Sequence, residues 1–339
     1  GAGPGVWFSG RQSRLQAHPP PMSATAASQP SALRVEVRSL GGDRALDLEL
    51  EPGSSVCELK AAVEQAWAVP RAFQRLVLGA EPLKDGECVE DGCYQLVVSL
   101  DAACRDLEQG DSLLRARTLE ELGRLGQRGG PAAAAAVSAC LEDEDDDVRQ
   151  AAAHALARVA RAGDASAASA LRAHLRDDDP FVKEAVVAGL AQIAPRGDGC
   201  AVDALVECLA EDENPWVRQA AAQAIAQLAE EGDGRAIAGL LGCFEDEYYD
   251  VRLAAVLALA QVACRGDRRA VSALSGCLRD AAAEVRGAAA RALAQVSGKG
   301  NARAISALSA RLKDRDDEVR SAVACALADL RGEGKPRTV

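Results

Sequence analysis

Three histidines and eleven cysteines are among the side chains in this 339-residue chain that could bind a metal or act as a nucleophile. An iron site built on His-Glu pairs needs a glutamate directly after a histidine, but His154 is followed by Ala155 and His174 by Leu175. The cysteines form no CxxC pair, and no GxSxG, P-loop or HExxH motif occurs. We therefore expect no catalytic residue, no metal and no cofactor, and we interpret the chain as a non-enzymatic protein.

The cysteines are better explained as packing residues. Several of them recur at similar positions of a helical pattern, namely Cys140, Cys208, Cys243 and Cys277. A thiol behaves as a small hydrophobe when it is buried, whereas a disulfide framework or a zinc cluster would need tighter spacing. Reduced thiols are typical of an intracellular protein, and we expect a cytoplasmic one.

The overall charge limits the partners that we expect. With 51 acidic and 39 basic residues, the formal net charge is -12, and an acidic surface repels phosphate backbones. No apolar run reaches the roughly 18 residues of a membrane span. We therefore expect neither nucleic-acid binding nor membrane insertion, and a protein partner instead; the oligomeric state stays open.

Ion-pairing residues recur with a fixed spacing between residues 102 and 331. An apolar-basic pair returns every 34 residues, with one step of 35, at Leu114-Arg115, Val148-Arg149, Val182-Lys183, Val217-Arg218, Val251-Arg252, Val285-Arg286 and Val319-Arg320. An aspartate precedes the basic residue by six positions in each full unit, whereas the first unit has Gln109 there. Gly-Asp or Gly-Asn turns follow the same period, as at Gly163-Asp164. A period of this kind indicates a tandem repeat.

Each repeat is predicted to hold two helices. A short helix such as residues 270–278 precedes a second helix that begins at the apolar-basic pair and runs about 13 residues, as in 251–263. Two helices per 34 residues with an acidic turn resemble the HEAT family, in particular the short repeats of phycobilisome-lyase-like HEAT proteins. The resemblance implies an all-α, right-handed solenoid of about six to seven two-helix repeats over residues 102–339. It also implies that the Asp and Arg residues link neighbouring repeats in a ladder rather than bind a ligand.

One stripe of the second helices is variable and mostly polar. Counted from the basic residue, offsets 1, 5 and 9 vary, while the positions between them are almost always apolar and must pack the core. Second helices line the concave face of HEAT arrays, so variation there would provide specificity. The predicted partner-binding stripe comprises Gln192, Gln219, Gln223, Gln227, Leu253, Leu257, Gln261, Arg291 and Gln295.

Two sets within this stripe have alternative explanations. The glutamines at offset 9 could bind a partner's backbone or form a repeat-to-repeat ladder. Leu253 and Leu257 could be an interaction hot spot, or leucines tucked against a neighbouring unit.

Aromatic residues gather at the turn between paired helices. Phe181, Trp216, Tyr248 and Tyr249 come from three consecutive units, and the same turns are acidic, as at residues 142–147 and 211–213. Aromatic residues are favoured at protein interfaces, and carboxylates also cap helices. We predict an edge site for a partner segment that is basic or apolar.

The N-terminal part of the chain has a different organisation. Residues 1–31 are expected to be a disordered leader, with translation starting at Met22. Alternating residues 33–50 predict a hairpin, and the spacing of residues 56–67 predicts a helix after a cap at Ser54-Ser55. Residues 74–78 and 96–100 predict two more strands.

These elements resemble ubiquitin in their order and in several motifs: Glu51-Pro52, Leu59-Lys60, Val69-Pro70, Gln74-Arg75-Leu76-Val77 and Leu83-Lys84-Asp85-Gly86. The resemblance implies an α+β ubiquitin-like β-grasp domain over residues 32–101. Its recognition patch would include Leu40 and Val77, but Ser99 replaces an apolar patch residue and Glu81 matches a chain-building lysine. No terminal Gly-Gly follows the last strand, so the domain is expected to act as an integral docking module or a structural cap.

The sequence therefore favours a protein–protein interaction scaffold or adaptor. In this hypothesis the concave face of the solenoid binds one partner and the ubiquitin-like domain docks to a second. Two alternatives remain open: a phycobilin-lyase-like protein that handles a chromophore, and a structural subunit of a larger complex.

Overall fold

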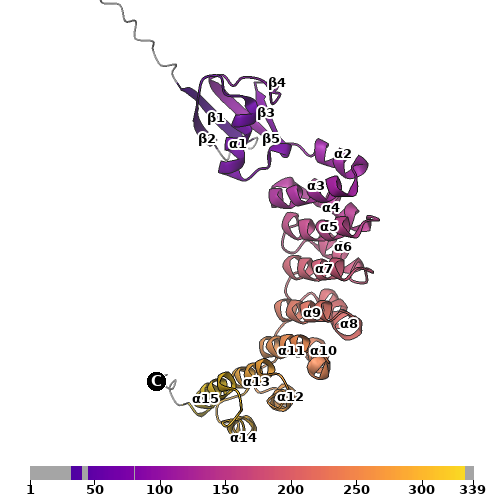
Figure 1. Cartoon of the computed structure of the whole chain (residues 1–339), viewed down its shortest axis with the longest axis vertical. Coiled ribbons are helices and arrows are strands. Elements are labelled where there is room, and N and C mark those ends of the chain that lie inside the picture. Colours follow the sequence, from indigo (N-terminus) through magenta and orange to yellow (C-terminus); the bar gives the residue numbers. More distant parts are fainter. Residues whose placement is uncertain (1–31, 40–44, 80, 333–339) are drawn as a thin grey trace, which may run out of the picture.

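The computed structural model describes residues 32–39, 45–79 and 81–332. A small mixed domain is followed by a long curved stack of helices (Figure 1). The predicted leader of residues 1–31 and the patch residue Leu40 lie outside the described residues.

The N-terminal domain holds a mixed sheet with the strand order β2-β1-β5-β3-β4. Its strands in the described residues are β1 (Leu33–Ser39), β2 (Ala45–Leu50), β3 (Gln74–Leu78), β4 (Glu81–Pro82) and β5 (Gly92–Val98). The central pair β1 and β5 is parallel, and the other neighbours are antiparallel. The alternation in residues 33–50 correctly predicts the first hairpin, in which Leu33 lies opposite Leu50.

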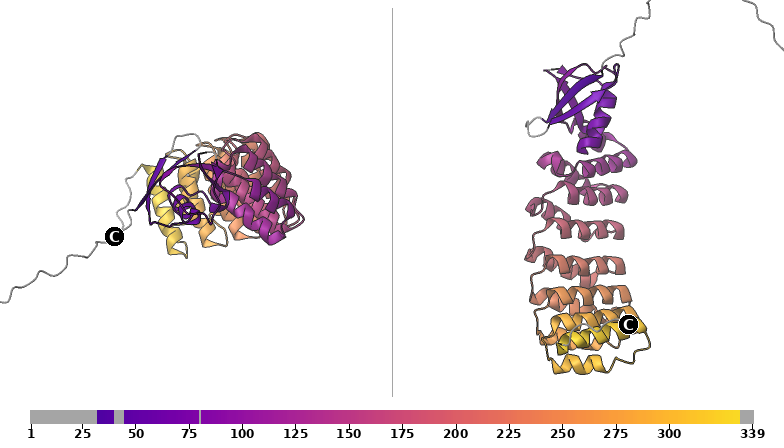
Figure 2. Two further views of the ribbon diagram at one scale, coloured as in Figure 1. Left: turned by 90° about the horizontal axis from the view of Figure 1, so that it is seen from above. Right: turned by 90° about the vertical axis from the view of Figure 1, so that its left-hand side faces the viewer.

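A single helix, α1 (Val56–Trp67), covers one face of this sheet (Figures 1 and 2). The Ser55 side chain accepts from the Glu58 amide, and the Glu58 carboxylate accepts from the Ser55 amide, so both orphan donors are satisfied. The predicted helix and its N-terminal cap are therefore confirmed. Ala68 ends the helix in the left-handed region, with φ of 50°.

The last strand differs from the prediction. It begins at Gly92, four residues before the predicted Leu96, and it ends at Val98. Its start is set by pairing with β1, in which Gly92 lies opposite Val35. The alternation of apolar and polar residues within one strand does not specify which residues of another strand it pairs with. Ser99 donates its hydroxyl to the Asp101 carboxylate and leads into the next helix.

The rest of the described chain is helical, and its helices form two rows. The inner row lies on the concave side of the stack (Figure 1) and comprises α3 (Ser112–Leu125), α5 (Asp146–Val159), α7 (Pro180–Ile193), α9 (Pro215–Leu228), α11 (Tyr249–Val262), α13 (Ala283–Val296) and α15 (Asp317–Arg331). The outer row comprises α4 (Gly130–Ala139), α6 (Ala165–Ala173), α8 (Gly199–Glu211), α10 (Gly234–Gly242), α12 (Arg268–Cys277) and α14 (Ala302–Ser309). Helix α2 (Asp101–Gln109) precedes both rows.

The predicted two-helix unit is confirmed, but the inner helices start earlier than predicted. Helix α11 begins at Tyr249 rather than at Val251. In α5, α7 and α9 a side-chain cap explains the earlier start: Asp145, Asp179 and Asn214 accept amide protons from the first turn, so that turn forms before the valine. Helix α11 has no side-chain cap, and its first turn is closed by the backbone bond from the Arg252 amide to the Tyr248 carbonyl. A proline at the start of α7 and α9 is compatible with this turn because its missing amide has no helical partner there.

The glycine of each turn connects neighbouring repeats. Gly163, Gly197, Gly232, Gly266 and Gly300 all have positive φ, between 76° and 89°. Each glycine amide donates to a carbonyl at the end of the next inner helix, at 2.6–2.8 Å. The acceptor is the last residue of that helix, as from Gly163 to Ile193, except that Gly300 donates to Leu330, the last residue but one of α15. The following Asp or Asn caps the next outer helix, as predicted. A backbone ladder thus joins the C-terminal ends of the inner helices.

The two domains touch. Arg128, in the turn after α3, donates a hydrogen bond to the carbonyl of Trp67 at the end of α1. Helix α2 also packs against the short 3₁₀ turn Arg71–Phe73 of the N-terminal domain. In two views the sheet domain sits at the α2–α3 end of the stack (Figures 1 and 2).

Candidate protein interface

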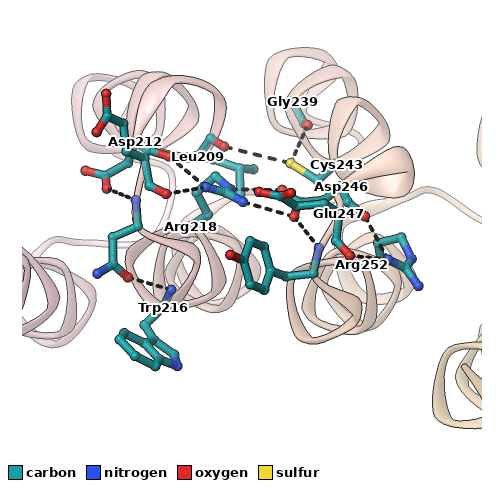
Figure 3. A network of polar contacts seen from close by, with 12 residues as sticks. Leu209, Asp212, Trp216, Arg218, Gly239, Cys243, Asp246, Glu247 and Arg252 are labelled. Atoms are coloured by element: carbon teal, nitrogen blue, oxygen red, sulfur yellow. Dashed lines mark hydrogen bonds and ion pairs between the residues drawn. The ribbon is translucent and has the colours of Figure 1, made fainter.

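A ladder of charged residues joins the N-terminal ends of the inner helices. Arg149 donates from Nε and Nη2 to the carboxylate of Asp177 in the next repeat, at 2.8 and 3.0 Å, and from Nη1 to the carbonyl of Asp143 in its own repeat. Figure 3 shows Arg218 between Asp212 and Asp246 in the same way. The predicted ladder is therefore confirmed: each aspartate side chain accepts hydrogen bonds from the basic residue of the preceding repeat.

The ladder is regular along the array. Its ion pairs measure 2.6–2.8 Å and are Arg115–Asp143, Arg149–Asp177, Lys183–Asp212, Arg218–Asp246, Arg252–Asp280 and Arg286–Asp314. Their side chains are between 4% and 17% exposed. Arg115 of the first unit, which has Gln109 in place of the aspartate, donates to the Gly110 carbonyl instead.

Three of the ladder aspartates, Asp177, Asp280 and Asp314, are stabilised in the ionised form. Burial raises the pKa of Asp177 and Asp280, but hydrogen bonds from Arg149 and Arg252 and from backbone amides outweigh it, and both pKa values are lowered. For Asp314 the hydrogen bond from Arg286 is the largest effect and lowers its pKa. The ladder is therefore structural, and it holds the inner helices in a fixed arrangement.

The variable stripe lies along the inner helices, where Figure 2 (right) shows them as parallel rungs. Grooves between adjacent inner helices are lined by stripe positions, as at Gln150, His154 and Arg158 between α3 and α5. Of the predicted binding residues, these are exposed: Gln192, Gln223, Gln227, Leu257, Gln261, Arg291 and Gln295. Gln219 and Leu253 are half-buried.

The glutamines divide between the two explanations. Gln295 donates from Nε2 to the carbonyl of Ala260 at 2.9 Å, which is a repeat-to-repeat bond. Within the described part of the chain, the side chains of Gln192, Gln227 and Gln261 make no such bond. Three members of this row are therefore available to a partner.

The two leucines also differ. Leu257 is 46% exposed, whereas Leu253 is half-buried and packs against the core. Both lie on α11, the fifth of the seven inner helices described above. Leu257 fits the hot-spot explanation, and Leu253 has the character of a leucine tucked against its neighbours.

The predicted edge aromatics all lie at the N-terminal ends of inner helices. Their exposed fractions are 59% for Phe181, 62% for Trp216, 47% for Tyr248 and 46% for Tyr249. Phe181 and Trp216 follow the first proline of α7 and α9, whereas Tyr249 is the first residue of α11 and Tyr248 its cap. The tyrosines therefore sit one and two positions earlier in their repeat than the other two aromatics.

The sequence matches the family model for HEAT repeats over residues 104–191, 182–260 and 237–328. The chain belongs to the HEAT-repeat family. Among curated proteins, none matches the sequence.

Solved structures with similarity to this HEAT array cover 68–69% of the chain. Human deoxyhypusine hydroxylase in complex with glycerol is 20% identical, with a TM-score of 0.35 and 85% of that chain covered. An engineered protein is 25% identical, with a TM-score of 0.47 and 68% covered. YibA of Escherichia coli is 23% identical, with a TM-score of 0.49 and 82% covered. The family assignment rests on the sequence match and not on these superpositions.

The HEAT array also exposes an edge residue that sequence reasoning missed. Leu113, near the start of α3, is strongly exposed. It precedes Arg115 by two residues, as Phe181 precedes Lys183 and Trp216 precedes Arg218. Comparison of this offset across all HEAT repeats could have found it.

The N-terminal domain presents little of the predicted patch. Val77 is half-buried on β3, opposite Gln95 and diagonal to Val97 of β5. Leu40 is not described, and Ser99 is occupied by its bond to Asp101.

Within the described residues, no group of three or more His, Cys, Asp or Glu side chains could hold a metal ion. No helix in that part of the chain is long and apolar enough to span a membrane.

Proposed function

We propose that this protein is a non-enzymatic interaction scaffold whose concave HEAT surface binds a protein partner. The observation that carries the proposal is Leu257, an exposed apolar side chain at the centre of a polar stripe. Protein interfaces commonly have an apolar anchor surrounded by polar groups, and exposed Gln223 and Gln261 supply such groups beside it.

Two ladders support this proposal because they hold the inner helices at both ends. The ion pairs join the N-terminal ends, and the glycine amides join the C-terminal ends. A surface that is ordered before binding loses less conformational entropy when the partner arrives. The stripe is therefore suited to recognition of a folded or extended protein surface.

The N-terminal domain is the second binding module in this proposal, and we propose that it is ubiquitin-like. Its strand order, its parallel central pair and its single helix over one face support that identity. The chain passes from β5 into α2 through Ser99 and Leu100 alone. The domain would therefore act as a docking module within the chain and not as a conjugated modifier. We also propose that the helical solenoid is right-handed, as the resemblance to HEAT proteins implies.

The test is a lysate pull-down with the full chain, comparing wild type with a Leu253→Glu, Leu257→Glu double variant. A carboxylate at these positions would place an unpaired charge in the interface, so a concave-face partner should be lost. Leu257→Glu alone should also lose the partner, because it places the charge at the exposed leucine. Since this side chain is already 46% exposed, its replacement leaves the fold intact, and the loss would not reflect unfolding.

Leu312→Glu is the matched control. Leu312 is 45% exposed, but it lies in the turn between α14 and α15, away from the stripe. A partner that is retained by this control and lost by Leu257→Glu supports the concave site. Equal retention by wild type and by the double variant contradicts it.

A further inference from the structure

The exposed aromatics form a strip across three successive repeats, distinct from the concave stripe. Phe181, Trp216 and the pair Tyr248–Tyr249 lie at the N-terminal ends of α7, α9 and α11, and these helices pack side by side. Figure 3 shows the Trp216 ring pointing away from the Arg218 network toward the outside. The large exposed rings therefore follow the long axis of the array, one repeat after another.

In the described part of the chain, the strip is bordered by exposed carboxylates that form no ion pair. Within the described residues, no Lys, Arg or His lies within ion-pair distance of the exposed side chains of Asp178, Glu213, Glu247, Asp250 and Glu284. The negative charge affects one ring of the strip: the charge of Asp250 and its hydrogen bond, with a contribution from Glu284, raise the pKa of Tyr249. The surface is thus both aromatic and negative.

One ring of the strip already binds a guanidinium group. The Arg218 Cζ lies 5.9 Å from the centroid of the Tyr248 ring, within the range of a cation–π interaction. The same guanidinium is bound by both oxygens of Asp246, at 2.8 and 3.0 Å. This edge therefore already binds one arginine of the protein itself between an aromatic ring and a carboxylate.

We propose that this edge, from Phe181 to Tyr249, binds an extended, arginine-containing segment of another protein. A guanidinium can stack on a ring and pair with a carboxylate in two-point geometry, which an ammonium cannot do. A phosphate-bearing polymer would be repelled by the same carboxylates. The site goes beyond the proposed concave interface and uses a separate set of residues.

The repeat spacing predicts the spacing of the arginines. Packed helices lie about 8–10 Å apart, so the rings on successive inner helices are separated by about that distance. An extended segment in the polyproline II conformation has three residues per turn and advances about 3.1 Å per residue, so side chains three residues apart lie on the same side, about 9 Å from one another. The favoured segment therefore carries arginine at every third position, with each arginine facing one repeat.

The experiment measures fluorescence anisotropy of a labelled synthetic peptide with arginines at i, i+3 and i+6, titrated with the full-length protein. We expect Trp216→Ala to weaken binding by about tenfold, because it removes a ring that contributes cation–π energy. Glu213→Gln combined with Glu247→Gln should weaken binding by a similar factor and reduce its salt dependence. A peptide with lysines at the same positions should bind less tightly.

Two control variants separate this site from the concave one. Leu257→Ala removes an exposed apolar residue of the concave stripe, and Glu230→Gln with Glu231→Gln removes two exposed charges after α9. Both should leave peptide affinity within about twofold of wild type. The proposal is overturned if the peptide does not bind, if Trp216→Ala binds as well as wild type, or if a peptide with three adjacent arginines binds equally well. None of these results would affect the concave-face pull-down.

Discussion

At the scale of single residues, the buried cysteines show how packing controls chemistry. Cys140, Cys208, Cys243 and Cys277 are buried, which confirms that they serve as small core side chains. Burial raises the pKa of Cys140 and Cys243 to about 11, and that of Cys208 and Cys277 to about 12. The thiolate is the reactive form, so these four groups are unreactive at neutral pH in the folded protein.

This shift predicts a loss of stability at alkaline pH. The unfolded chain releases these protons near pH 9.0, whereas the folded protein retains them until about 11 or 12. The folded state therefore binds more protons in that window, and the free energy of unfolding falls as pH rises through it. Urea denaturation at several pH values should show this slope. A Cys208→Ala, Cys277→Ala variant, although less stable, should show a shallower slope; an unchanged slope would contradict the explanation.

At the scale of elements, the turn glycines are needed for their backbone conformation. Gly266 has φ of 89°, and a Cβ at this position would meet no atom within 4 Å. Its amide donates to the Val296 carbonyl at 2.6 Å and joins two repeats. The requirement for glycine is thus conformational and not steric, because an L-residue in this region is strained.

A matched pair of substitutions tests this requirement. Gly266→Ala should destabilise the protein by about 1–2 kcal/mol through left-handed strain. Gly276→Ala also has open space around the new methyl group but lies in helix α12, so it should stabilise by about 0.5–1 kcal/mol. Thermal or urea unfolding measures both. Changes of the same sign in the two variants would contradict the conformational explanation.

At the scale of the whole molecule, the array is a chain of nearest-neighbour contacts. Each inner helix packs on the next, and each junction carries one ion pair and, for most repeats, one glycine bond. Stability in such an array is approximately a sum of repeat and interface contributions. Loss of the contacts at one junction should therefore destabilise only the repeats next to it. The shape of the concave surface nevertheless depends on all junctions being formed.

The Arg286–Asp314 junction offers the sharpest test of this localisation. Both side chains are only 4% exposed, so Asp314→Ala leaves a buried guanidinium without its carboxylate and should cost about 3 kcal/mol or more. Hydrogen exchange should accelerate in α12–α15 and stay unchanged in α5–α9. Asp203→Ala removes the exposed pair with Arg235 and should cost no more than about 1 kcal/mol. Uniform acceleration along the array would contradict the nearest-neighbour description.

Much of this architecture follows from local patterns in the sequence. The 34-residue period places the helix pairs and the charged residues of the ladder, because each repeat forms the same local structure. The cap at Ser55 and the hairpin pattern in residues 33–50 are equally local, since caps and side-chain alternation depend on a few neighbouring residues. The identity of the candidate surface residues also follows from the variable helical offsets.

Contacts between distant segments were decided only by the tertiary structure. The start of β5 depends on its pairing with β1, and the glycine bonds depend on how one repeat stacks on the next. Gln295 is engaged by the Ala260 carbonyl, while Gln261 at the same offset is free of such a bond within the described residues. Periodicity assigns these two glutamines the same place in the repeat. Packing between repeats distinguishes them, because a hydrogen bond requires a partner within about 3 Å that sequence spacing does not supply.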